Sequence, residues 1–136
     1  MDNIIYHGTS KEKAPDIVKS VDLNLGRGEL GRGFYTGTSI AMAKVWATHR
    51  FPKSYAVVKF EISEQKFLLL DGHLIRTKTR VKKIWDDLRE KNITDTYLFG
   101  KDYVMAPFAT SDIGHQIKFE SQKAANELND SKKTIY

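Results

Sequence analysis

A dense run of glycines between residues 26 and 37 constrains the fold of this chain more than any other feature. The run contains Gly26, Gly28, Gly31, Gly33 and Gly37. Glycine adopts backbone angles that are closed to other residues, and it lets two backbones approach closely. We therefore expect this stretch to form a loop, and a compact structural Ω-loop is its simplest form.

Part of the glycine run matches a dinucleotide-binding pattern in its letters. The segment Gly26-Arg27-Gly28-Glu29-Leu30-Gly31 reads GxGxxG. That fingerprint requires a strand directly before it and a helix that opens within it. Here a polar turn precedes the segment, and Phe34-Tyr35 follows it before any helix. The sequence also contains no GxxxxGK[ST] motif, so it argues against Rossmann and phosphate-loop sites.

Length and composition narrow the class of protein further. The chain has 136 residues, which suits a single domain spanning 1–136 with one core. It has no cysteine, which excludes disulfides, thiolate metal ligands and a cysteine nucleophile. Its four histidines form no HxH or HExxH pair, so we expect no metal site. The net charge of +5 favours an anionic partner, although a solvated basic surface would carry the same charge.

The hydropathy of the chain bears on its location. No apolar run approaches the roughly 20 residues that cross a bilayer. The sequence begins with Met1 and Asp2 and has no basic region at this end, where only Ile4, Ile5 and Tyr6 are apolar. This start lacks the pattern of a signal peptide. We therefore expect a cytoplasmic protein without a membrane partner.

The pattern of apolar residues predicts short strands mixed irregularly with helices. Strands are expected at residues 4–7, 55–62, 67–70, 103–105 and 116–119. Helices are expected around residues 15–21, through 41–47 after a Thr38 or Ser39 cap and ending before Pro52, at 81–88, and after a Ser121 cap. Residues 129–136 are polar and are expected to fray. Irregular mixing of this kind favours an α+β fold over a regular βαβ alternation.

Three segments in this order resemble one enzyme family. They are Tyr6-His7-Gly8-Thr9-Ser10, then Gly31-Arg32-Gly33-Phe34-Tyr35-Thr36-Gly37 with Ser39, Ala43 and Trp46-Ala47, and finally Gln116-Ile117-Lys118-Phe119 with Ala124 and Leu128. Together they resemble ADP-ribosyltransferases of the diphtheria-toxin and poly-ADP-ribose-polymerase type, which carry a His-Tyr-Glu triad. The resemblance is closest to small bacterial and phage members whose third position can be Glu, Asp or Gln. It extends from near the start of the chain to near its end.

The resemblance implies a compact fold in which two short antiparallel sheets, flanked by helices, form an NAD cleft. It implies NAD⁺ as co-substrate, no metal, and the catalytic residues His7, Tyr35 and Gln116. His7 would bond a ribose hydroxyl, and the backbone of Gly8 would pair with the nicotinamide carboxamide. Tyr35 would stack on the nicotinamide ring. Gln116 would contact the nicotinamide ribose.

The resemblance also implies further cofactor contacts from Thr9, Arg32, Ser39 and Trp46. Arg32 would meet the pyrophosphate through its charge, and Trp46 would form a second aromatic wall. Each residue has a simpler structural reading as well. An aromatic residue such as Tyr35 or Trp46 is often part of a core, Ser39 suits a helix cap, and Arg32 suits a solvated loop.

Gln116 departs from the family's glutamate. A glutamine accepts a hydrogen bond from a ribose hydroxyl, but it carries no charge and is no general base. Glu120 and Asp112 are therefore alternative sources of a carboxylate. At strand spacing, Gln116, Lys118 and Glu120 share one face.

These features predict a mono-ADP-ribosyltransferase that transfers ADP-ribose from NAD⁺ to a protein or nucleic acid. The resemblance suggests a toxin or effector of bacterial or phage conflict, which would need an antitoxin or inhibitor protein as a partner. The alternatives are an NAD⁺ glycohydrolase and a non-enzymatic module that binds NAD or RNA. The positive charge slightly favours a nucleic acid, which would dock on the basic cluster of Arg76, Lys78, Arg80, Lys82 and Lys83. The solvated face of a helix would give the same cluster.

Overall fold

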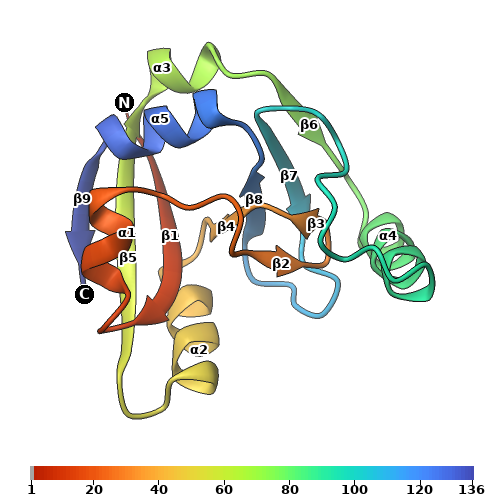
Figure 1. Ribbon diagram of the computed structural model, residues 1–136, viewed down its shortest axis with the longest axis horizontal. Helices are drawn as coiled ribbons and strands as arrows, with labels where there is room; N and C mark the ends of the chain where they lie inside the picture. The colour runs from red at the N-terminus through yellow and green to blue at the C-terminus, as the bar shows by residue number, and fades with distance from the viewer. Residues whose placement is uncertain (1) are drawn as a thin grey trace.

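A computed structural model describes residues 2–136 and leaves Met1 outside the described residues. Among the described residues, seven strands join in one sheet with the order β6-β7-β8-β4-β1-β5-β9 (Figure 1). Their bounds are β1 (Asp2–Ser10), β4 (Phe34–Gly37), β5 (Tyr55–Ser63), β6 (Gly72–Leu74), β7 (Tyr103–Pro107), β8 (His115–Phe119) and β9 (Lys132–Ile135). A separate hairpin consists of β2 (Arg27–Gly28) and β3 (Gly31–Arg32). The helices are α1 (Ala14–Lys19), α2 (Ile40–Arg50), α3 (Glu64–Leu68), α4 (Lys78–Glu90) and α5 (Gln122–Asp130).

The α+β class expected from the sequence is confirmed, but the sheets differ from the expected two short antiparallel ones. One large sheet runs through the molecule, and its β6–β7 pair is parallel. The join at its centre is slight, because β1 pairs with β4 only between Tyr6 and Gly37 among the described residues. By contrast, β1 pairs with β5 along its whole length, from Asp2 to Ser10.

The larger core lies between the sheet and helices α1 and α5. Alternate residues of β5 are buried there, as the sequence predicted, namely Ala56, Val58, Phe60 and Ile62. Ala14 from α1 and Leu128 from α5 are fully buried against them. Burial of apolar area of this kind is the main favourable contribution to folding.

A second core lies under α4, beside β7. The helix buries Val81, Ile84 and Leu88 there, as its spacing predicted, together with Ile75, Val104, Ala106 and the hairpin residue Leu30. The hairpin and α4 therefore share one apolar cluster, which fixes the position of the glycine-rich segment.

Local capping chemistry sets where two of the helices begin. Ser39 accepts a hydrogen bond from the backbone N–H of Met42, and Ser121 accepts one from Ala124. Both caps were predicted, because a serine in extended conformation satisfies one of the unpaired donors of the first turn.

Three expectations were wrong. Residues 67–70 do not form a strand, because the segment belongs to α3 and the turn after it, and Ser63 caps that helix. A short apolar run is compatible with a strand or a helix, and here the Ser63 cap favours the helix. Residues 129–136 do not fray, because β9 pairs with β5 and Lys133 donates to carbonyl oxygens at the end of α5. The glycine run is not only a loop, because it contains β2, β3 and β4.

The helices of residues 2–136 are all too short or too polar to cross a bilayer.

Candidate functional site

The direction of the hydrogen bonds along β1 decides which of its backbone groups face β4. Val57 exchanges both of its backbone hydrogen bonds with Tyr136, at 2.8 and 3.1 Å, so its N–H and C=O point away from β1. Bonded and non-bonded pairs alternate in an antiparallel ladder. Gly8 lies opposite Val57. Its N–H and C=O therefore point away from β5 and toward β4.

The two central strands separate at the level of Gly8. Tyr6 pairs with Gly37, and Gly8 would next face Tyr35, but the β1–β4 pairing does not continue there among the described residues. Instead, the His7 Nδ1 atom lies 2.5 Å from the Tyr35 carbonyl oxygen and replaces a backbone donor. The backbone pairing of β1 with β4 is thus interrupted at Gly8, and this break in the pairing, hereafter the gap, leaves one donor and one acceptor of Gly8 directed toward β4.

Helix α2 packs directly against Gly8. A Cβ atom added to Gly8 would lie 2.5 Å from the carbonyl oxygen of Ala43 and 3.2 Å from the Cβ of Ala47. Both distances are shorter than normal van der Waals contact. A glycine is therefore required at this position for α2 to approach β1, whatever the gap binds.

His7 is neutral at physiological pH and has a defined tautomer. Burial lowers its pKa from 6.5 to about 4, the hydrogen bond with Tyr35 opposes this, and the charge of Arg50 adds to it. Its ring stacks on Phe34 with centroids 4.3 Å apart. Because a carbonyl oxygen only accepts, Nδ1 carries the proton and Nε2 keeps a lone pair. His7 can therefore accept a hydrogen bond from a hydroxyl group.

Tyr35 leaves the sheet on the face opposite to His7. Successive residues of a strand alternate in direction, and Phe34 already points toward His7. The Tyr35 hydroxyl accepts a hydrogen bond from the Leu30 N–H at 3.0 Å and donates to the Gly31 carbonyl at 2.5 Å. A Cβ atom added to Gly28 would lie 2.9 Å from its ring. Tyr35 thus holds the β2–β3 hairpin against β4.

The environment of the Tyr35 hydroxyl keeps it protonated. Burial raises its pKa well above the usual value, the hydrogen bond from Leu30 opposes this, and the charges of Glu29 and Glu120 raise it further. The hydroxyl is therefore a neutral hydrogen-bonding group and not a base at physiological pH.

Gln116 donates a hydrogen bond to Glu29, a glutamate that was not among the residues predicted for the site. Its side chain is buried, and its Nε2 donates to Glu29 Oε1 at 2.9 Å and to the Pro107 carbonyl at 3.0 Å. Glu29 Oε1 also accepts from the Ala109 N–H at 3.2 Å. The one signal in the sequence was that Glu29 is the only acidic residue between residues 26 and 37.

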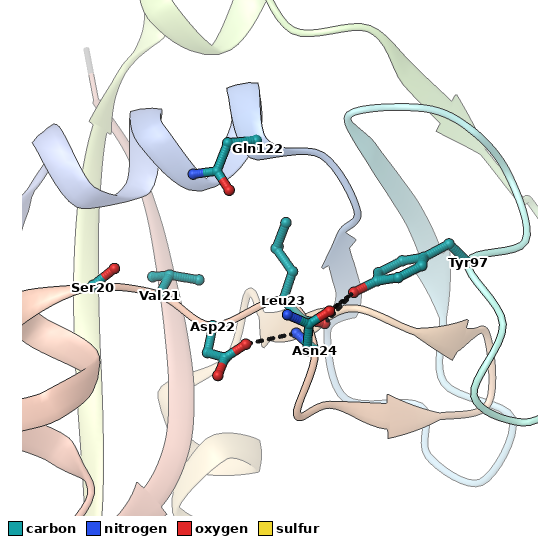
Figure 2. A pocket seen from close by; sticks show the side chains of 7 residues that line it. All are labelled: Ser20, Val21, Asp22, Leu23, Asn24, Tyr97 and Gln122. Atoms are coloured by element: carbon teal, nitrogen blue, oxygen red, sulfur yellow. Dashed lines mark hydrogen bonds between the residues drawn. The ribbon is translucent and has the colours of Figure 1, made fainter.

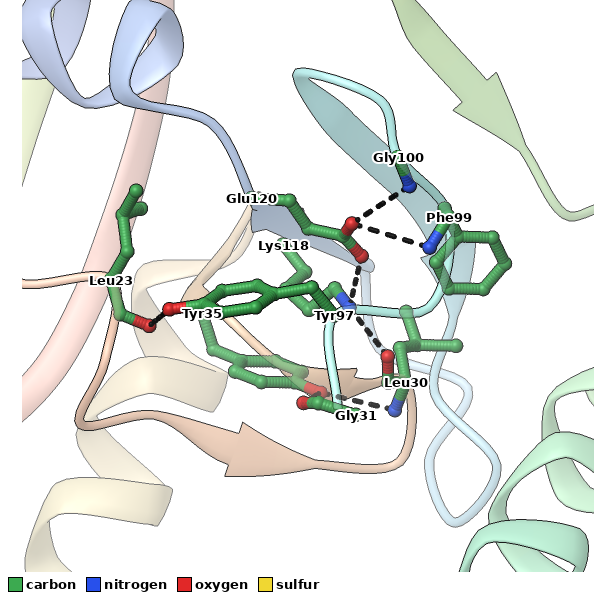
Figure 3. Close-up of polar contacts among 9 residues, drawn as sticks. All are labelled: Leu23, Leu30, Gly31, Tyr35, Tyr97, Phe99, Gly100, Lys118 and Glu120. Carbon is green, nitrogen blue, oxygen red and sulfur yellow. Dashed lines mark hydrogen bonds and ion pairs between the residues drawn. The ribbon is translucent and has the colours of Figure 1, made fainter. Parts of the chain in front are cut away.

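A buried ion pair supports the other side of the hairpin (Figure 3). Lys118 is fully buried, donates to the Leu30 carbonyl at 2.5 Å and pairs with Glu120. Glu120 Oε1 accepts from the N–H groups of Phe99 and Gly100, each at 3.2 Å. Burial lowers the pKa of Lys118, and Glu120 opposes that effect.

Both carboxylates that the sequence offered in place of a third-position glutamate are used elsewhere. Glu120 is committed to Lys118 and to two backbone donors. The Asp112 side chain is 91 % exposed and pairs with Lys78. Neither one is held by Gln116, whereas Glu29 is.

The remaining residues predicted to contact the cofactor lie in different surroundings. Ser39 uses its hydroxyl to cap α2, as its structural reading predicted. Thr9 is buried in β1. Trp46 lies on α2 with 48 % of its surface exposed, and within residues 2–136 it has no ring contact with His7 or Tyr35.

Arg32 contacts two residues that line an open cavity of about 390 Å³, whose lining residues are shown in Figure 2. Its Nε donates to the Asn24 carbonyl at 2.9 Å, and its guanidinium lies 5.6 Å from the centre of the Tyr97 ring. Asn24 and Tyr97 both line the cavity, together with Ser20, Val21, Asp22, Leu23 and Gln122. A volume of this size falls within the usual range for small-molecule sites.

The basic cluster lies at the start of α4 and just before it. Arg76, Arg80, Lys82 and Lys83 are exposed, while the apolar side chains of the helix face the core. Lys78 pairs with Asp112. Asp112 follows Ala109 closely, and Ala109 donates its N–H to Glu29, so one loop connects the cluster with the Gln116 site.

The strand order places His7, Tyr35 and Gln116 on three neighbouring strands, β1, β4 and β8. No protein-family model matches this chain, and no curated protein sequence matches it either.

Proposed function

We propose that this protein is a mono-ADP-ribosyltransferase that binds NAD⁺ in the gap between β1 and β4. The observation that carries the proposal is Gly8, whose backbone N–H and C=O point into the gap without a partner in β4 among the described residues. A carboxamide offers one acceptor and a pair of donors. The nicotinamide carboxamide therefore complements Gly8, in the manner of a missing strand residue.

The side chains at the gap suit the rest of the nicotinamide nucleoside. A ligand in the gap would have the Tyr35 ring on one face and His7 on the other, because the two side chains leave the sheet in opposite directions. The aromatic ring would pack on nicotinamide. The lone pair of His7 Nε2 would accept a hydrogen bond from a ribose hydroxyl.

The anionic half of NAD⁺ would extend toward Arg32. Its Nε is occupied by Asn24, but a guanidinium carries five N–H donors, which leaves others for a pyrophosphate. The cavity beside Arg32 would take the adenosine end. Both features fit a dinucleotide that lies across the hairpin and the central strands.

The reaction requires mainly that the enzyme position NAD⁺ and the acceptor. The bond between nicotinamide and the ribose carbon breaks, nicotinamide leaves with the bonding electrons, and the sugar gains oxocarbenium character. Groups fixed by folding contribute through orientation and through charge directed at the reacting centre. A nucleophile of the acceptor then bonds to the ribose carbon and receives the ADP-ribose. If the enzyme acts as a toxin, we expect a partner protein that inhibits it.

Labelled NAD⁺, incubated separately with cell protein, RNA and DNA, tests the proposal. We expect label in one pool, with nucleic acid slightly favoured as the acceptor because of the basic cluster. The His7→Ala variant should lose this label. His49→Ala, which alters an exposed histidine on α2, is the matched control. Release of nicotinamide without label would indicate a glycohydrolase. Absence of both label and NAD⁺ binding would contradict the proposal.

A further inference from the structure

We infer that Glu29 supplies the catalytic carboxylate that Gln116 cannot, and that Gln116 is the positioning residue for Glu29. This inference rests on the proposed function. Gln116 stands at the third position of the expected triad, and its amide nitrogen lies 2.9 Å from Glu29 Oε1. A carboxylate is thus present one hydrogen bond away from the place where the glutamate of the triad would be.

The two oxygens of Glu29 have different environments. Oε1 accepts from the Gln116 amide and from the Ala109 N–H. Oε2 accepts no hydrogen bond within residues 2–136, and it is not among the fully buried atoms without a partner, so it keeps some contact with solvent. One oxygen is therefore anchored, and the other is available to a ligand.

The hairpin that carries Glu29 is held firmly enough for this purpose. The next residue, Leu30, is fully buried in the core under α4. Its N–H is bound by the Tyr35 hydroxyl and its carbonyl by Lys118. A side chain whose backbone is fixed on both sides is positioned by the fold and loses little freedom when substrate binds.

The arrangement explains the buried Lys118 as well. A charged amine in a core is costly unless it is paired and hydrogen-bonded. Lys118 meets this condition through Glu120 and through the Leu30 carbonyl, which is the neighbour of Glu29. The ion pair therefore acts as a support for the hairpin, and it leaves Glu29 as the carboxylate beside Gln116.

The chemical step balances with Glu29 as base. The bond between the ribose C1 and the nicotinamide nitrogen breaks, and nicotinamide leaves as a neutral molecule with the electron pair. The negative charge of Glu29 stabilises the cationic sugar. An O–H or N–H nucleophile of the acceptor then bonds to C1, and its proton passes to Glu29 Oε2. No oxidant or metal is consumed.

The decisive variant is Glu29→Gln. Its amide oxygen can still accept from Gln116 and Ala109, so the variant removes charge and basicity while it keeps the anchoring contacts. We expect kcat to fall by about 10²-fold or more, the usual range for loss of a general base. NAD⁺ affinity, measured by calorimetry, should stay close to that of the wild type. Asp112→Asn, which neutralises an exposed carboxylate on the adjoining loop, is the matched control and should keep full activity.

A second variant tests placement. Glu29→Gln combined with Gln116→Glu exchanges the two groups, keeps an amide-to-carboxylate hydrogen bond, and should recover part of the lost kcat. Wild-type rates in Glu29→Gln would overturn the inference and leave the proposed function intact. Loss of NAD⁺ binding together with activity would also overturn it, because it would assign Glu29 a structural role. A wild-type protein that neither binds NAD⁺ nor transfers ADP-ribose would overturn both proposals.

Discussion

Acidification should destabilise this protein through His7, and the size of the effect follows from its environment. The pKa of His7 is about 4 in the folded state and 6.5 in an ordinary environment. As the pH falls, the unfolded chain therefore takes up this proton first. The stability that neutral His7 contributes is complete above about pH 6.5 and is lost as the pH falls toward 4.

The magnitude comes from that difference. At about 1.4 kcal/mol for each pH unit, the interval between 6.5 and about 4 corresponds to about 3–4 kcal/mol. About 2 kcal/mol of it should already be lost at a pH of about 5. Such a loss is a large part of the stability of a small domain, which is about 5–15 kcal/mol.

Chemical denaturation at a series of pH values measures this effect. Carboxylates titrate in the same range, so the informative quantity is the difference between the wild type and a His7→Asn variant, whose amide can still donate to the Tyr35 carbonyl. The variant should lack the His7 component of the pH dependence. His49→Asn, on the exposed surface of α2, should keep it. Equal pH dependence in the wild type and in His7→Asn would refute the assignment of a neutral, partly buried His7.

Two further predictions concern the hairpin and the basic cluster. Leu30→Ala should lower the free energy of unfolding by about 2–5 kcal/mol, because Leu30 is fully buried in the core under α4, and a loss below about 1 kcal/mol in urea denaturation would contradict this packing. Replacing Arg80, Lys82 and Lys83 with alanine should reduce modification of nucleic acid and weaken its salt dependence, while NAD⁺ affinity is retained. Unchanged modification at several salt concentrations would show that the acceptor docks elsewhere.

Those parts of the fold that depend on local chemistry could be predicted from the sequence. Ser39 and Ser121 cap α2 and α5 because a serine before an apolar helical pattern satisfies donors of the first turn. The alternation in β5 indicated its buried face correctly, since side chains on a strand alternate between the two faces.

Features that depend on distant partners could not be predicted. The tail pairs with β5 through backbone hydrogen bonds, which polar residues such as Lys132 and Thr134 do not reveal. A glycine hairpin is ambiguous until its neighbours are known, and here Tyr35 and Lys118 fix it. The contact between Glu29 and Gln116 joins residues 87 positions apart in the chain. No local pattern carries that information.

For the same reason, only part of the arrangement of the candidate site could be predicted from the sequence. The sequence indicated His7, Tyr35 and Gln116 as candidates, and the strand order places them on adjacent strands. It did not indicate that His7 would bind the Tyr35 carbonyl, which replaces a ladder hydrogen bond where β1 and β4 separate. That separation depends on the competition between a side chain and a backbone donor for one acceptor.

The most direct test of NAD⁺ binding in the gap is the amide resonance of Gly8 in an ¹⁵N-labelled sample titrated with NAD⁺. We predict a saturable shift at Gly8, because its N–H points into the gap and would donate to the nicotinamide carboxamide. The shift should follow the same binding curve as the resonance of Tyr35. Saturable binding of NAD⁺ that leaves both resonances unchanged would place the ligand elsewhere and contradict the site, and absence of binding would contradict the proposed function itself.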